Sequence, residues 1–267
     1  MLWKKIIIFC LALLTVSCTS VSITDRKQLI ILGDDVIYPQ AFKAFNDFKA
    51  KSKLIKEGVD FENIQQVTEN IKKAITTYYK KNGKKDPTSN FSWEVILVDD
   101  KDTKNAWCMP GGKMAVYSGI LEITNNNNAL AALIGHEIAH AVARHGSERA
   151  SQGVILDLGT AALEQIILGR SLSGHSQKLY NYFTTFGVML PFSRSHEKEA
   201  DFLGLVFMYL AGYEMEEASE MWKRMSKLNS FRASPEFLST HPSNKNRIKN
   251  INSWIPIIKR EYSSQIM

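Results

Sequence analysis

The residues whose types and spacing point most directly to chemistry are His136, Glu137 and His140, in the order His-Glu-x-x-His. Residues four apart in an α-helix lie on the same face, one turn apart. The two histidines can therefore offer imidazole nitrogens to one metal ion. Zinc suits such ligands, and a catalytic zinc site leaves one position to water. Because zinc lowers the pKa of that water to about 7, the adjacent Glu137 can take its proton as it attacks a carbonyl.

The sequence around this motif predicts a buried helix. The run is apolar and contains small residues that allow close packing, namely Ala131, Ala132, Gly135, Ala139 and Ala141. Two histidines and a glutamate in such a run would be costly to bury without a partner, which a metal ion can supply. The asparagines at 125–128 can cap the start of the helix, and Gly146 can end it after about His145.

A catalytic zinc site needs a third protein ligand, and a downstream helix offers two carboxylates. Glu197 and Asp201 are four apart and share a face. A glutamate there can bind zinc, and an aspartate one turn later can accept a hydrogen bond from the second ring nitrogen of a ligand histidine. Glu199 points away from this face, so we expect it to be solvated. The competing ligands, which their positions disfavour, are His145, His175 and His196.

The elements that position these residues indicate an α+β fold, mostly helical with a small β-sheet beside the active-site helix. Apolar side chains three and four apart predict helices, and β-rich segments predict strands. The predicted helices before the motif are 39–55 and 60–78, the strands are 91–98, 105–109 and 113–117, and the later helices are 193–212, 214–228 and one that ends near Pro256. We expect one metallopeptidase domain over residues 36–267.

Two adjacent glycines, Gly111 and Gly112, join the last two predicted strands and permit a tight reversal. The edge of this sheet could pair with an extended peptide by adding a strand. Gly111, Gly112, Lys113 and Met114 are therefore candidate substrate-binding residues. A plain hairpin is the simpler interpretation, and the two can hold at once.

The first 17 residues predict a lipoprotein signal peptide. Lys4 and Lys5 precede an apolar core at 6–16 that is too short to span a membrane comfortably. A small residue and Cys18 follow, as in bacterial signals whose cysteine is lipidated, although Thr15 stands where leucine is usual. An ordinary secretory signal or an uncleaved anchor is the alternative. Lipid on Cys18 would anchor the protein at the periplasmic side of the outer membrane, or at the inner membrane.

The composition is that of a globular protein that does not depend on disulfides. The chain has 267 residues and a net charge of +6, which favours solubility or affinity for anionic surfaces. Residues 18–35 are expected to form the lipidated N-terminus and an extended tether. Cys10 would leave with the signal, so Cys108 would have no partner within the mature chain. No nucleic-acid motif appears, and the oligomeric state is not indicated.

Five motifs follow one another along the chain. They are Ile23-Thr24-Asp25-Arg26-Lys27-Gln28, Asn105–Lys113, Gly135–His140 with Ala143–His145, Ser193-Arg194-x-x-Glu197-x-x-Ala200-Asp201, and Thr240–Ser243 with Arg247-Ile248. Together they resemble the HtpX-like zinc metallopeptidases, the family that includes the CAAX prenyl proteases. Within it the chain is similar to the exported LoiP- and BepA-like bacterial branch and to the mitochondrial Oma-type proteases. Asp25 stands where this branch usually has glycine.

The resemblance implies a zincin fold with one zinc ion per chain, held by His136, His140 and Glu197. It implies that Glu137 is the general base and that Asp201 supports a ligand histidine. It also places His241 near the metal. There His241 could bind the oxyanion of the transition state or fill the open zinc position at rest, or it could only shape the loop.

These expectations combine into a zinc endopeptidase of the bacterial cell envelope that hydrolyses misfolded or stalled envelope proteins. An alternative is a latent protease that acts mainly as a periplasmic chaperone or outer-membrane assembly factor. A site closed by His241 or by the polar loop at 171–176 would favour that alternative. A zinc hydrolase for a non-protein envelope component is a third possibility, against which a peptide-binding strand would argue.

Overall fold

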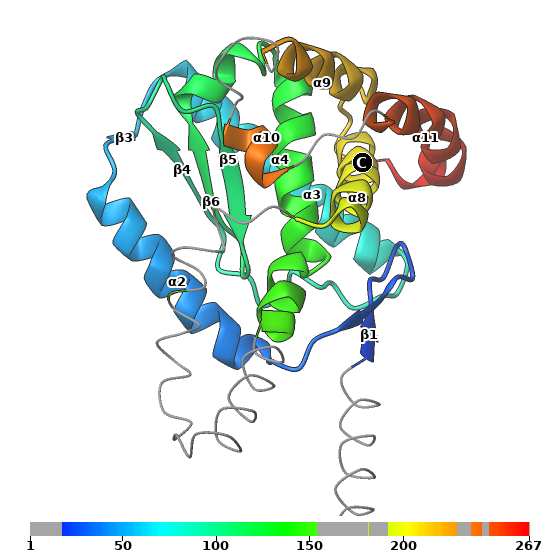
Figure 1. Cartoon of the computed structure of the whole chain (residues 1–267). Helices are drawn as coiled ribbons and strands as arrows, with labels where there is room; N and C mark the ends of the chain where they lie inside the picture. The colour runs from blue at the N-terminus through cyan, green and yellow to red at the C-terminus, as the bar shows by residue number, and fades with distance from the viewer. Residues whose placement is uncertain (1–17, 154–180, 182–191, 229–235, 242–245, 267) are drawn as a thin grey trace, which may run out of the picture.

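The computed structural model of this chain describes residues 18–153, 181, 192–228, 236–241 and 246–266. In these ranges the fold is mostly helical with a small mixed sheet, which confirms the expected α+β class (Figure 1). The strands are β1 (Cys18–Ser20), β2 (Lys27–Leu29), β3 (Leu54–Ile55), β4 (Glu94–Val98), β5 (Ala106–Met109) and β6 (Lys113–Tyr117). The helices are α2 (Asp34–Lys51), α3 (Val59–Lys81), α4 (Asn127–Val142), α8 (Arg194–Leu210), α9 (Glu216–Leu228), α10 (Glu236–Thr240) and α11 (Arg247–Tyr262), with the short 3₁₀ helices η1 (Ser118–Glu122) and η3 (Ser263–Gln265).

The larger sheet has the strand order β3–β4–β6–β5. Strands β4 and β6 are parallel, whereas β3 pairs with β4 and β5 pairs with β6 in antiparallel fashion. Because side chains alternate along a strand, the sheet packs on two cores. In β4, for example, Leu97 joins the core shared with α3 and α4, whereas Ile96 joins the core shared with α2. The sheet thus lies between α2 and the helices that surround α4 (Figure 1).

Two glycines let the central helices α4 and α8 approach closely. A Cβ atom on Gly135 of α4 would lie 3.1 Å from the backbone oxygen of Gly204, and one on Gly204 of α8 would lie 3.0 Å from the backbone nitrogen of His136. Larger side chains would hold the two backbones apart. The crossing therefore fixes the distance between the helix that carries the His-Glu-x-x-His motif and the helix that carries Glu197.

We expect the substitution Gly204→Val to lower the free energy of unfolding by about 1–3 kcal/mol, because the added atoms would overpack this crossing. Urea denaturation of the metal-free protein measures the change. Lys198→Val, at an exposed position of the same helix, controls for the intrinsic helix propensity of valine. Equal losses in the two variants would contradict the importance of the crossing.

Helix ends differ from the sequence-based expectation at two places. Helix α4 ends at Val142, not near His145, because Arg144 adopts a left-handed backbone with φ 58° and starts a new helical segment at residues 145–153. Helix α11 continues past Pro256 to Tyr262, since Ile255 and Ile258 pack into the core on both sides of the proline. The polar loop at 171–176, which could close the site, lies outside the described residues.

The segment 18–35, expected to be an extended tether, contains the antiparallel pair β1–β2. These two strands and their connecting turn, residues 18–29, form the N-terminal hairpin. Its connecting turn is closed by hydrogen bonds from the Asp25 amide to the Val21 carbonyl (2.8 Å) and from the Val21 amide to the Arg26 carbonyl (3.0 Å). Asp25 has φ 53°, a conformation that glycine or a short polar residue adopts most readily.

Of the helices in the described ranges, none has both the length and the apolar character that crossing a membrane requires.

Candidate metal centre

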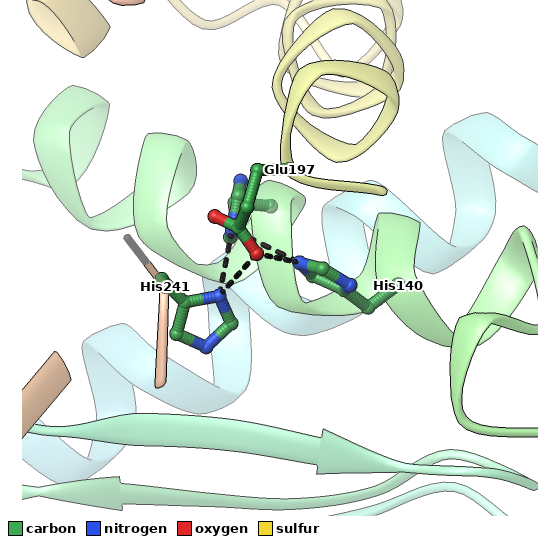
Figure 2. A group of neighbouring side chains, drawn as sticks. His140, Glu197 and His241 are labelled. Carbon is green, nitrogen blue, oxygen red and sulfur yellow. Dashed lines mark hydrogen bonds and ion pairs between the residues drawn. The ribbon is translucent and has the colours of Figure 1, made fainter. Parts of the chain in front are cut away.

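Three elements bring the motif residues together. Helix α4 carries the two histidines and Glu137, α8 carries Glu197, and His241 directly follows α10. Figure 2 shows the side chains of His140, Glu197 and His241 converging on one point. Capping supports both helices: the Asn126 side chain accepts a hydrogen bond from the Ala129 amide (2.8 Å), and the Ser193 hydroxyl accepts one from the His196 amide (3.2 Å) at the start of α8.

The spacing of the donor atoms fits a zinc ion. The Nε2 atoms of His136 and His140 lie 3.1 Å apart. The carboxylate oxygens of Glu197 lie 3.5 Å from Nε2 of His136 and 3.3 Å from Nε2 of His140. Ligands at the usual zinc bond lengths in a tetrahedron are about 3.3 Å apart. Two imidazoles and a carboxylate at these distances are the donor set that a zinc site requires.

Asp201 contacts the ring nitrogen of His136 that faces away from the centre. Its carboxylate Oδ1 lies 3.0 Å from Nδ1 of His136, which leaves Nε2 facing the centre. Burial lowers the pKa of His136, but its hydrogen bonds with Asp201 and Glu197 outweigh burial and raise this pKa to about 9. Burial also lowers the pKa of His140 well below its usual range, so that imidazole is neutral. Although burial raises the pKa of Glu197, the surrounding histidines hold it well below the usual range and keep this carboxylate ionised.

Glu137 lies beside the centre with one oxygen available. Its side chain is buried, and its Oε1 has no hydrogen-bond partner among the described residues. The carboxylate accepts a hydrogen bond from the backbone amide of Cys108 on β5, and Oε1 lies 3.5 Å from Nε2 of His241. Burial raises the pKa of Glu137. A carboxylate with a raised pKa is a stronger proton acceptor than an ordinary one.

The side chain of His241 lies against the three candidate ligands. Its Nδ1 atom lies 3.0 Å from Oε1 of Glu197 and 3.2 Å from Nε2 of His136. It thereby completes a group of four donor residues whose ligand atoms all lie within 4.8 Å of one another. The ring stacks on Phe237 with centroids 4.4 Å apart and is 1% exposed. From this position His241 could supply a fourth ligand to a metal ion.

Arg247 belongs to the fifth sequence motif but had no expected role, and the structure places it in the site. Its Nη2 group donates hydrogen bonds to Glu197 (3.0 Å) and Asp201 (2.7 Å), and its guanidinium lies 3.5 Å above the ring of Trp222. Neighbouring carboxylates raise its pKa even though burial opposes this. Arg247 is 2% exposed and balances two buried negative charges. An arginine at the start of an amphipathic helix gives no sequence signal of such burial.

The residues that sequence analysis set aside also lie near the centre. His145 is fully buried, with Nδ1 2.9 Å from Nδ1 of His140, so it contacts a ligand from behind. His196 pairs with Glu148 (3.1 Å). Glu199, expected to be solvated, is 6% exposed and bonds to His145. This expectation is wrong because a neighbouring helical segment and the N-terminal hairpin cover that face of α8. His175 lies outside the described residues.

The candidate substrate-binding residues are placed differently from the expectation. Lys113 and Met114 belong to β6, which pairs with β4 on one side and β5 on the other, so it cannot accept a further strand. Gly111 and Gly112 are packed under aromatic rings, since a Cβ on either would lie less than 3 Å from Phe42 or Trp93. This placement does not support peptide binding at these four residues. The strand beside Glu137 is β5.

Comparison with known proteins finds relatives of one kind, which are peptidases. The family model for peptidase family M48 matches residues 63–255. The chain is 38% identical over 182 residues to the mitochondrial metalloendopeptidase OMA1 of Schizosaccharomyces pombe, covering 66% of this chain and 51% of that protein. The OMA1 proteins of Saccharomyces cerevisiae (33%; 61% of this chain, 47% of that protein) and Homo sapiens (32%; 88% and 45%) are similar as well. The chain spans about half the length of these relatives.

These relatives correct the predicted location. Each is named as a mitochondrial protein, which contradicts a place on the periplasmic side of a bacterial outer membrane. That expectation came from the signal-like first 17 residues and from the resemblance to an exported bacterial branch, and neither identifies the compartment. Membership of an exported bacterial branch is likewise not confirmed. Lipid attachment to Cys18, with the membrane as its partner, is untested and stays a prediction.

The match at 63–255 spans the residues that converge in the structure, namely His136, Glu137, His140, Glu197, Asp201, His241 and Arg247. Donor chemistry, donor spacing and the family model therefore agree on a zinc metallopeptidase. The chain belongs to peptidase family M48.

Proposed function

We propose that this protein is a zinc-dependent endopeptidase that hydrolyses peptide bonds in unfolded or misfolded proteins, and that its role is protein quality control. The observation that carries the proposal is the buried group of His136, His140 and Glu197 with an available carboxylate oxygen of Glu137 beside it. The name metalloendopeptidase of its relatives supports the same reaction.

The proposed mechanism assigns roles to residues of this chain. When bound, zinc polarises the scissile carbonyl and acidifies a water molecule. His136, His140 and Glu197 would hold the ion, with Asp201 fixing the tautomer of His136. Glu137 takes the proton from the attacking water and later delivers it to the leaving amine. Its raised pKa favours the first of these transfers.

The substrate is best accommodated along β5. Within the described residues this strand pairs only with β6, so its other edge is available for an extended peptide. The Cys108 amide on β5 donates a hydrogen bond to Glu137, which places that edge beside the proposed base. A peptide added there would carry its carbonyl groups past the metal ligands. This assignment replaces the turn at Gly111 and Gly112.

Metal removal tests the proposal. The full chain is purified, zinc per chain is measured, and cleavage of an unfolded protein is followed before and after dialysis against a chelator. We expect one zinc per chain, loss of cleavage without it, and recovery when zinc is added back. A wild-type protein that binds no zinc, or one that cleaves equally well without metal, would contradict the proposed function.

The position of His241 favours a second candidate, a latent protease that acts mainly as a chaperone. Because Nδ1 of His241 lies among the ligand atoms, it could fill the substrate position at rest. In cells, Glu137→Gln separates the two candidates, since it would abolish the function of a protease and leave a chaperone working.

We expect His241→Ala to raise cleavage of an unfolded protein several-fold, because it frees the position that water and substrate need. Initial rates of peptide release measure the effect, and Ser239→Ala on α10 is the matched control. A fall in cleavage with zinc retained would instead assign His241 to the reaction itself, as a donor to the oxyanion.

A further inference from the structure

Behind His140, on the side away from the metal centre, buried polar groups form an unbroken chain to the N-terminal hairpin. Nδ1 of His140 lies 2.9 Å from Nδ1 of His145. Nε2 of His145 lies 2.8 Å from Oε2 of Glu199. The Glu199 carboxylate in turn accepts hydrogen bonds from the hydroxyl of Thr24 and from Nε of Arg26. The hairpin is therefore linked to a metal ligand through two intervening side chains.

The proton positions along this series of hydrogen bonds can be assigned one by one, starting at the metal centre. His140 directs Nε2 to the centre, so as a neutral ligand it carries its proton on Nδ1. That proton is donated to Nδ1 of His145, which must then carry its own proton on Nε2 and donate it to Glu199. Assigned in this way, every donor meets an acceptor. Because the Glu199 carboxylate can only accept hydrogen bonds, it fixes which group donates and which accepts along the whole series.

The surroundings of Glu199 agree with this assignment. Glu199 is 6% exposed, and its carboxylate meets three donors, on His145, Thr24 and Arg26. A buried carboxylate is costly unless charged or polar partners meet it. Here two of those partners come from the hairpin.

Two unusual backbone turns produce the arrangement. The left-handed backbone of Arg144 breaks the helix after α4, so that His145 returns toward His140 instead of continuing along the helix. The turn at Asp25, which is also left-handed, sets Thr24 and Arg26 on either side of it, and both reach Glu199. Arg26 also donates to Glu148 on the segment that follows His145 (2.9 Å), which holds the hairpin against that segment.

We propose that Thr24, Arg26, Glu199 and His145 are positioning residues for the metal ligand His140, so that the N-terminal hairpin sets the metal affinity of the centre. The inference rests on the proposed zinc site and extends it to a segment more than 100 residues away in the sequence. An ordered partner on the second ring nitrogen strengthens a histidine ligand, and loss of such a partner typically costs 10–100-fold in metal affinity.

The experiment compares two glutamates that share Arg26. Glu199 also bonds to His145, whereas the described hydrogen bonds of Glu148 go to Arg26 and His196. Zinc dissociation constants of the full-length wild type, Glu199→Gln and Glu148→Gln are measured by competition with a chelator. We expect Glu199→Gln to weaken zinc binding at least about tenfold. Glu148→Gln should weaken zinc binding much less than Glu199→Gln, because it removes an ion pair of the same arginine but no hydrogen bond of His145.

A second pair of variants tests the hairpin itself. Thr24→Val keeps the shape of the side chain and removes the hydroxyl donor, whereas Thr24→Ser keeps the donor. We expect the valine variant to weaken zinc binding and the serine variant to restore wild-type affinity. The visible spectrum of the cobalt(II)-substituted protein reports ligand geometry, and it should change in Glu199→Gln and Thr24→Val alone.

The outcomes separate this inference from the proposed function. Wild-type protein that binds no zinc would overturn the proposed function, and the inference with it. Zinc bound equally by Glu199→Gln, Glu148→Gln and the wild type would overturn the inference alone. Circular dichroism and thermal unfolding of the metal-free variants identify a general folding defect, and the Thr24 pair decides the question if Glu199→Gln has one.

Discussion

The substitution Glu137→Gln is expected to lower cleavage by about 10²–10⁴-fold while zinc remains bound, because general acid–base catalysis typically contributes that factor. Glutamine keeps the volume of the side chain but cannot take a proton from water. Glu137 is not among the four grouped donor residues, so metal content should stay at the wild-type value. Initial rates on an unfolded protein and zinc per chain are measured on the same preparation.

Glu62→Gln, an exposed glutamate on α3, is the matched control for Glu137→Gln and should behave as wild type. Cleavage at the wild-type rate by Glu137→Gln would remove this residue from the mechanism. Zinc binding without cleavage by either wild type or variant would point to a latent centre, and the His241→Ala variant would then show whether the fourth position is the cause.

The largest effect on stability is expected for Arg247→Met, which should lower the free energy of unfolding by about 3–5 kcal/mol. The guanidinium is buried between Glu197 and Asp201, and removing it leaves two buried carboxylates without their positive partner. Methionine retains much of the contact with Trp222, so the loss reports mainly the charge. Chemical denaturation at equal zinc concentration measures it.

Arg260→Met controls for this change. Its side chain is 75% exposed, and its ion pair lies on the surface, where substitutions usually stay within about 0.5 kcal/mol. Similar losses in the two variants would contradict the importance of the buried pair. Zinc affinity should also fall in Arg247→Met, because Glu197 would lose the hydrogen bond that orients its second oxygen.

Local spacing determined much of this site in advance. His136, Glu137 and His140 share one helix, and Glu197 and Asp201 share another, so the period of the helix alone places each set on a common face. The strands and the buried stripe of α3 follow from equally local patterns. The relative arrangement of Asp201 and His136 was expected from chemistry, because a ligand histidine needs a partner for its second nitrogen.

The tertiary structure alone decided the contacts between groups that lie far apart in the chain. The place of Nδ1 of His241 among the ligand atoms, the burial of Arg247 and the bond between Glu199 and His145 all depend on how separate elements pack. The sequence predicted a solvated Glu199, because this residue lies on a different face of its helix from Glu197. In the structure, the N-terminal hairpin and the helical segment at 145–153 cover that face. Sequence periodicity fixes which face of an element a side chain occupies, whereas the partner of that face is chosen by long-range packing.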